Sequence, residues 1–470
     1  MSFDSLEFLL FAGAFFALWP LFRTTDRRRW AFLGLASLFF YAWGGLKFTP
    51  LLLSTAIVSW ATGLAIDRWR ERRRPILLAS LAVNLGTLGF FKYLDFLLEN
   101  VNEVFAAFGV RSQLPFARLV LPVGISFYTF EAISYTVDVY RGRVKPARSF
   151  LEFFAFLALF PRLVAGPIVR AGQFMPQLES WTRPTPLRLW DGLRLIVYGF
   201  TKKLVVADHL ARAVDSGFRA SEVAGTTPFW WLMSLLFVVQ IYCDFSGYSD
   251  IARGLAKWMG YDLPVNFDHP LFSPSMTKFW QRWHVSLMSW LRDYVFYPLS
   301  GKRPSSLRIN LAMTVTMLAS GVWHGAAWTF ILWGGINAIY LWAERALKWP
   351  ERLAKLRGGK GLSIAITFVL FVFAAVFFRA QTIGQALAIA GRMWSFDLGQ
   401  PISLVKDYFF ELLLAGAVLA RSLWFHVRLP QLGGWRRRAR YYSEPLELAV
   451  LLTACVFLRG PGNAFIYFQF

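Results

Sequence analysis

The sequence predicts an all-α protein that crosses a membrane many times. Of its 470 residues, 56% are hydrophobic and only 17% are charged, whereas soluble proteins carry about 25% charged residues. The chain also contains 47 Phe, 21 Trp and 16 Tyr, more aromatic surface than a water-soluble fold has interior to hide. A lipid bilayer is the alternative surrounding for these side chains. The distribution of apolar runs along the chain supports a membrane protein.

Apolar runs follow one another from the N-terminus onward. A helix that spans a bilayer needs about 20 mainly apolar residues. Long uncharged runs cover residues 9–22, 30–46, 48–66, 75–91, 223–243, 309–343 and 361–378. Shorter or charge-dotted candidates cover 120–140, 150–169, 193–206, 404–420 and 446–458. The first run is not a convincing cleaved signal, because Asp4 and Glu7 precede it and no A-x-A site follows.

The basic residues predict the orientation. The net charge of +22 lies in clusters between apolar runs rather than along one amphipathic face, which favours a lipid partner over nucleic acid. Cytoplasmic loops of membrane proteins are rich in Lys and Arg. We therefore expect five segments in the cytoplasm: Arg23–Arg29, Asp67–Arg74, Arg141–Arg148, Arg345–Lys360 and Arg436–Arg440. Both termini then fall on the outer side, and some of the basic charge is free to attract a phosphorylated cytosolic ligand.

The chain is expected to form one membrane domain over residues 1–470. Its N-terminal spans occupy 1–149, its core 150–345, and its C-terminal spans and tail 346–470. Charged residues interrupt nearly every apolar stretch between 150 and 308. Irregular backbone at membrane depth is tolerated only where protein or a wet cavity surrounds it, so the functional site is expected in this core.

His324 is the first candidate. It is the one ionisable side chain in the run 309–343, which as a straight helix would be about 50 Å long and exceed a hydrocarbon core of about 30 Å. A break is therefore predicted near Gly321, Gly325 or Gly334–Gly335. An ionisable residue at this depth indicates function, and a buried neutral imidazole suits a general base. The alternative is a histidine hydrogen-bonded between helices.

His284 is the second candidate. It lies in FWQRWHVSLMSWLRDYVFYPL, residues 279–299, where Arg282, Arg292 and Asp293 make a lipid-facing span implausible. The tryptophans of the segment are typical of the membrane interface. The alternative is an interfacial amphipathic helix with an incidental histidine.

Two further motifs carry polar residues beside apolar runs. In YCDFSGYSDIARG, residues 242–254, Asp244 and Asp250 directly follow a span and could simply pair with Arg253 or Lys257. In LFPRLVAGPIVRAGQF, residues 159–174, Pro and Gly break a helix, and Arg162 and Arg170 either orient an anion or anchor a re-entrant loop. The candidate substrate-binding residues are Arg162, Arg282, Trp283, Trp323, Asp244 and Ser246.

Several other chemistries find no support in the sequence. Cys243 and Cys455 each lie inside an apolar run, and no Cys/His cluster suggests a metal site. No GxSxG, GxxxxGK[ST] or HExxH motif occurs. His209, His269 and His426 lie in surface or turn patterns.

Together the four motifs resemble the membrane-bound O-acyltransferase family, specifically its bacterial alginate O-acetyltransferase branch. The matching segments are LFPRLVAGPIVR, YCDFSGYSDIARG, NFDHPLFSPSMTKFWQRWHVSLMSWLRDYVFYPL and GVWHGAAWTFILWGGINA. They run in family order over about residues 159–338, and the hydropathy and the closing FIYFQF extend the resemblance over essentially the whole chain. The departures are Gln281, where arginine is common, and Asn337, where histidine is common.

The resemblance implies a ring of about 10–12 transmembrane helices, with re-entrant and interfacial helices around a central tunnel. It places His324 as the catalytic histidine and His284 as its companion. It implies acetyl-CoA as the donor substrate with no permanently bound cofactor, and an exported polysaccharide such as alginate as the acceptor. It further implies an SGNH or esterase-like periplasmic partner and the bacterial inner membrane as the location. The alternative is a transporter or channel with His324 as a proton relay, but no internal repeat supports it.

The last residues, RGPGNAFIYFQF, contain a single side-chain hydroxyl, that of Tyr467. So apolar a tail is expected to fold back into an apolar cavity, where it serves as a plug with Tyr467 as an interfacial anchor. The sharper hypothesis makes Tyr467 an acyl carrier, because a phenyl ester remains activated enough to hand its acyl group on.

Overall fold

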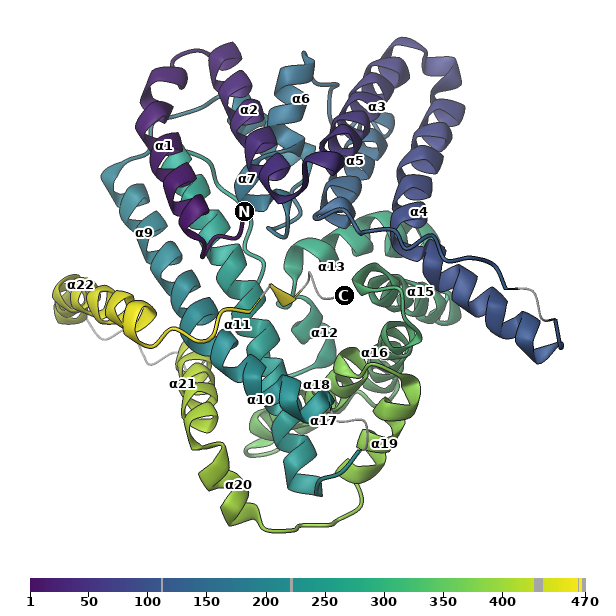
Figure 1. Cartoon of the computed structure of the whole chain (residues 1–470), viewed down its shortest axis with the longest axis vertical. Coiled ribbons are helices and arrows are strands. Elements are labelled where there is room, and N and C mark those ends of the chain that lie inside the picture. The colour runs from purple at the N-terminus through teal and green to yellow at the C-terminus, as the bar shows by residue number, and fades with distance from the viewer. Residues whose placement is uncertain (111–112, 220–222, 427–433, 464, 467–470) are drawn as a thin grey trace. The chain divides into compact units, whose positions relative to one another are not determined.

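The computed structural model describes residues 1–110, 113–219, 223–426, 434–463 and 465–466. Over these residues the chain is built of helices, and no β-strand occurs among them (Figure 1). The prediction of an all-α fold is confirmed.

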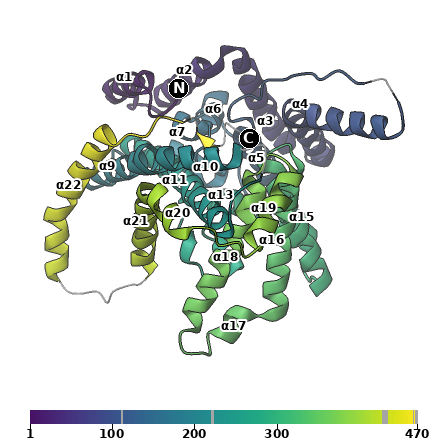
Figure 2. The same cartoon turned by 60° about the horizontal axis from the view of Figure 1, so that its bottom comes forward.

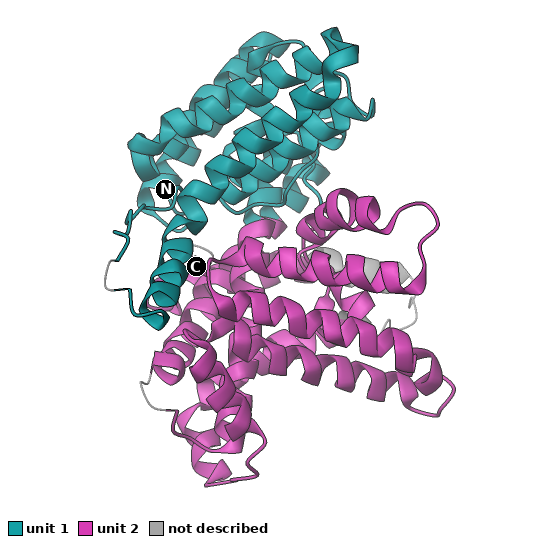
Figure 3. Cartoon of the chain, turned by 90° about the vertical axis from the view of Figure 1, so that its right-hand side faces the viewer, with its two compact units in different colours: residues 1–193, 251–264 teal, residues 194–250, 265–470 magenta. Residues whose placement is uncertain are grey.

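The chain divides into two compact units, each of which draws on two stretches of sequence (Figure 3). Unit 1 holds residues 1–193 and 251–264, and unit 2 holds residues 194–250 and 265–470. This division describes how the helices pack and not which part of the chain folds on its own. One membrane domain over residues 1–470 therefore stays a prediction.

Unit 1 is a set of helices from the first part of the chain. Its main helices are α1 Leu6–Phe22, α2 Asp26–Gly45, α3 Thr49–Arg68, α4 Arg73–Ala107, α5 Ile125–Tyr140, α6 Phe150–Leu157, α7 Phe160–Leu163 and α8 Ala171–Glu179. Short 3₁₀ turns, η1 Leu46–Phe48 and η2 Arg70–Arg72, join α2 to α3 and α3 to α4. The helix starts follow sequence signals, because the hydroxyls of Ser5 and Ser149 accept from the N–H groups of Phe8 and Glu152. The predicted span 9–22 falls within α1, and the predicted spans 30–46 and 48–66 each overrun α2 and α3 by one residue. Helix α4 continues well past the predicted end at residue 91.

The segment 150–169 of unit 1 is broken, as its Pro and Gly residues predict. Helix α6 ends at Leu157, and the short α7 begins at Phe160. The Phe160 ring packs 5.1 Å from the ring of Phe15 between centroids. A broken backbone is thus enclosed by protein, as membrane depth requires.

Unit 2 contains most of the remaining helices, including the greater part of α11. They are η3 Thr201–Ala207, α10 Asp208–Arg219, α11 Thr227–Met259, η4 Pro270–Phe272, α12 Met276–Trp280, α13 Val285–Leu291, η5 Arg292–Phe296, α14 Tyr297–Ser300, α15 Ser306–His324, α16 Trp328–Leu347, α17 Trp349–Leu353, α18 Gly359–Arg379, α19 Ile383–Met393, α20 Pro401–Asp407, α21 Phe409–His426 and α22 Gly434–Phe457. The π-helix η3 continues α9, Pro186–Phe200. The residues of α9 and α11 are divided between the two units.

Four helical stretches of the described chain are long and apolar enough to cross a membrane. They are Asp26–Arg68, Arg70–Ala107, Thr227–Met259 and Gly359–Arg379. Their apolar residues are not confined to a buried face: on α3, for example, Ile57 and Leu64 are exposed while Leu52 and Ile66 are buried. Helices that are apolar all round are typical of lipid surroundings.

Candidate active site

His324 lies at the tip of a helical hairpin in unit 2. Helix α15 ends at His324 and α16 begins at Trp328, so the predicted break near Gly325 is confirmed. The two helices lie side by side (Figures 1 and 2). Gly334 permits this approach, because a Cβ there would lie 2.5 Å from the carbonyl oxygen of Met317. The same holds at Gly321, where a Cβ would collide with the carbonyl oxygen of Phe330.

Aromatic side chains surround the His324 imidazole. Its ring centroid lies 5.0 Å from Trp323, 5.3 Å from Trp333 and 5.0 Å from Phe378, with interplanar angles of 81°, 90° and 75°. Only 6% of the residue is exposed. Edge-on packing of this kind holds the ring in one orientation.

His284 lies at a sharp turn just before α13. It adopts a left-handed backbone conformation, with φ 45° and ψ 51°, which is uncommon for residues other than glycine. The loop around Asn266 supports this turn. The Val285 N–H donates to the Asn266 carbonyl oxygen at 2.9 Å, and the Ser286 hydroxyl donates to Asn266 Oδ1 at 2.9 Å.

The two histidines meet in the interior of unit 2. Their ring centroids lie 6.3 Å apart, and Trp323 contacts both, at 5.5 Å from His284 and 5.0 Å from His324. His284 also contacts the ring of Phe245, with the ring centroids 4.6 Å apart. His284 is 1% exposed, and this burial lowers its pKa below the ordinary value. The imidazole of His284 is therefore neutral near pH 7.

The arrangement supplies a base and a hydrogen-bond donor at one place. A neutral imidazole carries one acceptor nitrogen and one N–H. One ring can therefore take a proton while the other stabilises developing negative charge. The surroundings exclude bulk water, which strengthens both effects.

A small cavity of about 20 Å³ adjoins His324. It is lined by Phe237, Val238, Ile241, Trp283, His324, Trp333, Phe371, Ala375 and Phe378. A volume of this size holds about one water molecule or a group of similar bulk. Apart from His324 the lining is almost entirely apolar, so the cavity suits a small apolar group beside the imidazole ring.

Trp283 and Trp323 belong to the same aromatic cluster as the histidines. The Trp283 ring lies 5.1 Å from Phe267 and 5.1 Å from Phe371, and both tryptophans are 4% exposed. Arg282 directly precedes the buried Trp283 and is itself partly exposed. Its carbonyl oxygen accepts from the N–H of Asp268 at 2.9 Å.

Asp244 is buried and paired with a lysine that the sequence reasoning missed. Lys203 Nζ lies 2.9 Å from Asp244 Oδ1 and 2.9 Å from Asp208 Oδ1. Its neighbour Lys202 pairs with Asp250 at 2.6 Å. Both lysines lie on η3, and a π-helical turn is frequent at functional sites. In the sequence, Lys202 and Lys203 are visible only as two positive charges that interrupt the apolar run 193–206.

Ser246 follows Phe245 on α11 and is 2% exposed. Its hydroxyl oxygen has no hydrogen-bond partner among the described residues. Since buried hydroxyls are normally paired, Ser246 stays a candidate for contact with a bound substrate.

Arg162 lies in unit 1, whereas the histidines lie in unit 2. Its guanidinium pairs with Glu131 and donates to the carbonyl oxygen of Phe156. The Val169 N–H donates to the same Glu131 carboxylate at 3.0 Å. These contacts hold α7 and the chain at Val169 against Glu131 of α5. The role of Arg162 in substrate binding stays a prediction.

Tyr467 lies outside the described residues. Within them, no group of three or more His, Cys, Asp or Glu side chains is placed to hold a metal ion.

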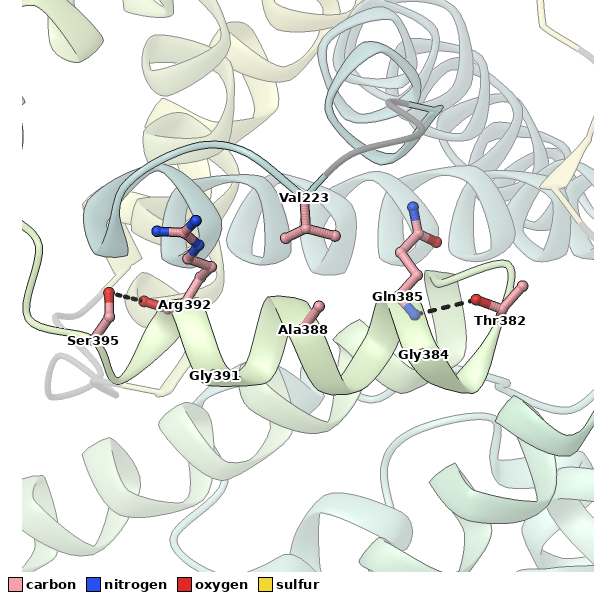
Figure 4. Close-up of a pocket in the computed structure, with 8 residues that line it drawn as sticks. All are labelled: Val223, Thr382, Gly384, Gln385, Ala388, Gly391, Arg392 and Ser395. Carbon is pink, nitrogen blue, oxygen red and sulfur yellow. Dashed lines mark hydrogen bonds between the residues drawn. The ribbon is translucent and has the colours of Figure 1, made fainter.

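A wider hollow of about 750 Å³ opens along α19 (Figure 4). It is lined by Val223, Thr382, Gly384, Gln385, Ala388, Gly391, Arg392 and Ser395. The predicted site residues do not line it. Small residues at 384, 388 and 391 leave one face of α19 open there.

Comparison with known proteins places these residues in a family context. The sequence model of one protein family, MBOAT, membrane-bound O-acyltransferase family, matches residues 141–383. A probable alginate O-acetylase, AlgI, of Pseudomonas aeruginosa is 37% identical over 99% of this chain and 87% of that relative. The probable alginate O-acetylase AlgI of Pseudomonas putida is 38% identical over 89% of this chain and 86% of that relative. A peptidoglycan O-acetyltransferase of Helicobacter pylori is 35% identical over 76% of this chain and 72% of that relative.

Proposed function

Because the chain belongs to the membrane-bound O-acyltransferase family, we propose that it moves an acetyl group from cytosolic acetyl-CoA towards a hydroxyl of an exported polysaccharide. The protein is a membrane-embedded, multi-pass O-acyltransferase, so the transporter alternative is set aside. The observation that carries the finer proposal is the pair of buried histidines whose ring centroids lie 6.3 Å apart at the tip of the α15–α16 hairpin.

In the proposed reaction His324 is the general base. It accepts the proton of the acceptor hydroxyl as the hydroxyl oxygen attacks the thioester carbonyl carbon. A carbon–oxygen bond forms, the carbon–sulfur bond breaks, and the proton passes to the departing sulfur, which leaves as CoA thiol. Proton transfer by a positioned side chain contributes about 10²–10⁴-fold to such a step.

His284 serves the carbonyl oxygen in this proposal. Its imidazole is neutral, so its N–H can donate to the oxygen as negative charge develops in the tetrahedral intermediate. The supported turn at Asn266 keeps the ring in place, and preorganised donors of this kind cost no reorganisation during the reaction. The same hydrogen bond from His284 would also orient the acyl donor.

The substrates are proposed to reach the histidines from opposite sides of the bacterial inner membrane. The basic loops, among them Arg68–Arg74 and Arg345–Lys360, are proposed to face the cytoplasm and attract the phosphates of CoA. Both termini are proposed to face the periplasm, where an SGNH or esterase-like partner completes transfer to alginate or another cell-envelope glycan. The names of the relatives, alginate and peptidoglycan O-acetylating enzymes, support a glycan acceptor.

Topology is tested by cysteine-accessibility labelling at position 72 and at the C-terminus. The proposal expects the first to react only from the cytoplasmic side and the second only from the periplasmic side. Reaction of both from the same side would contradict it.

Tyr467 is proposed as the carrier between the two sides. Its phenol oxygen would attack the thioester carbonyl with His324 as base, release CoA thiol, and then pass the acetyl group from the aryl ester to the partner. Intact-mass measurement after incubation with acetyl-CoA should show one acetyl group on the C-terminal peptide. If Tyr467→Phe acetylates the polymer at the wild-type rate, the tail is a packing plug instead.

The proposed activity is tested with purified protein and labelled acetyl-CoA. CoA release or covalent labelling that depends on His324 supports it. Binding of acetyl-CoA without either would count against it.

A further inference from the structure

The C-terminal segment of unit 2 returns to the interior after α22. Figure 1 shows it leaving α22 and crossing α11. Three contacts fix its path. The Gly460 N–H donates to the carbonyl oxygen of Leu204 at 2.8 Å, Lys203 Nζ donates to the carbonyl oxygen of Asn463 at 2.9 Å, and Asn463 Nδ2 donates to the carbonyl oxygen of Asp208 at 3.2 Å.

Gly460 is required at the start of this path. A Cβ at position 460 would lie 2.7 Å from the Cβ of Asp208 and 2.9 Å from its carbonyl carbon. The backbone of the tail therefore runs directly against the junction of η3 and α10, with no side chain between them.

Lys203 lies at the centre of the contacts. Its ammonium meets Asp208 and Asp244 at 2.9 Å each and the carbonyl oxygen of Asn463 at 2.9 Å, which matches the three donors of a lysine. The lysine side chain is 11% exposed and the two carboxylates are 1% and 4% exposed. Asp244 completes the set, since its Oδ2 accepts from the Ile466 N–H at 2.7 Å.

The segment held in this way reaches the neighbourhood of His284. Phe465 and Ile466 are 5% and 2% exposed. The Phe465 ring lies 5.8 Å from Phe245 and 5.0 Å from Tyr248, and Phe245 in turn contacts His284 at 4.6 Å. One aromatic ring thus separates the tail from the second histidine.

We infer that Lys203 is a positioning residue, which together with Asp244 docks residues 460–463 and 465–466 against Phe245 and thereby fixes the packing of His284. The inference rests on the proposed function for its catalytic consequence, whereas the docking itself does not. Two charged side chains contact the backbone of the tail directly: the Lys203 ammonium at Asn463 and the Asp244 carboxylate at Ile466. Asp208 adds the second carboxylate that pairs with Lys203. Buried charges are costly unless they are paired. Because the Lys203 and Asp244 charges use the tail backbone as a partner, the position of the tail is tied to that of η3 and α11.

The same helical turn offers a matched control. Lys202 pairs with Asp250 at 2.6 Å, so it joins η3 to α11 just as Lys203 does. Lys202→Met therefore removes an ion pair between the same two elements. It leaves intact the contacts of Lys203 with Asn463 and of Asp244 with Ile466.

The docking is tested by thiol labelling. Cys243 and Cys455 are replaced by alanine, Ile466→Cys is introduced, and the rate of maleimide reaction in detergent is measured with and without Lys203→Met. We expect Lys203→Met to raise the labelling rate at least about tenfold and Lys202→Met to leave it near the parent value. An unchanged rate in Lys203→Met would overturn the docking.

The catalytic consequence is tested by steady-state CoA release in the chain with its native cysteines. We expect Lys203→Met to lower kcat at least about tenfold with the KM for acetyl-CoA within about twofold, because small misplacement in a site costs up to about 100-fold. Lys203→Arg, which keeps the charge, should recover part of kcat. Equal kcat losses in Lys203→Met and Lys202→Met would reduce the cluster to a stabilising role and overturn the positioning.

A second variant covers the case in which Lys203→Met does not fold. Asp244→Asn keeps the shape and an acceptor oxygen for the Ile466 N–H but loses the charge, and we expect the same two effects at smaller size. If the parent protein releases no CoA at all, the proposed function fails, while the labelling rates still decide the docking.

Discussion

The imidazole rings of His284 and His324 lie 6.3 Å apart, and the indole of Trp323 contacts both. The two histidines reach this place on separate supports. His324 depends on the close packing of α15 on α16, and His284 depends on a left-handed turn held by Asn266. Each support can therefore be tested without changing either histidine.

The first prediction concerns the α15–α16 contact. Gly334→Ala should lower kcat by about 10-fold or more, because its Cβ would lie 2.5 Å from the carbonyl oxygen of Met317 and a small shift of the catalytic group is costly. Gly335→Ala is the control, since its Cβ would meet nothing closer than 3.9 Å. It should keep near-normal activity, because a methyl group fits there without a close contact. Alanine also stabilises a helix by about 1 kcal/mol relative to glycine. CoA release by the two variants decides the matter, and equal activities would contradict the packing argument.

The second prediction concerns the turn at His284. Asn266→Ala removes the acceptor of the Ser286 N–H and hydroxyl, and a buried donor left unpaired costs about 1–3 kcal/mol. We expect a lower melting temperature and a reduced kcat. Loss of stability with full kcat would show that the turn does not position His284.

The third prediction concerns pH. Burial lowers the pKa of His284, while the unfolded chain binds that proton with a pKa of about 6.5. The unfolded state therefore binds more protons below this pH, so the stabilising contribution is complete above about pH 6.5 and is lost as the pH falls. For one proton the slope is at most about 1.4 kcal/mol per pH unit. Melting temperatures between pH 7.5 and 5 should fall less in His284→Gln than in the parent protein, and parallel curves would count against this origin.

The periodicity and charge of the sequence predicted much of the fold. Uncharged runs located α1, α2, α3 and α18, and the length of the run 309–343 together with its glycines predicted the hairpin break beside His324. The end of α11 was missed. The predicted span stopped at Cys243, but the helix continues to Met259, because Asp244 and Asp250 find partners within the protein and so do not end it.

Other features of the site depend on contacts that no local pattern records. Lys203 and Asp244 come from distant parts of the chain, and Asn266 precedes the turn that it supports. The sequence could show that each is polar beside an apolar run, but not which groups they meet. Tertiary packing decides these pairings. The sequence could therefore single out the candidate histidines but not the residues that support them.

The most direct measurement is CoA release from labelled acetyl-CoA by purified His324→Ala. The account predicts at least about a 100-fold loss, since general base catalysis contributes about 10²–10⁴-fold, with expression and behaviour in detergent close to those of the parent. His209→Ala is the matched control, because His209 bonds to the carbonyl oxygen of Val205 one turn earlier in its own helical segment, and it should keep its activity. Activity of His324→Ala above about a tenth of the parent value would contradict the role of His324 as general base.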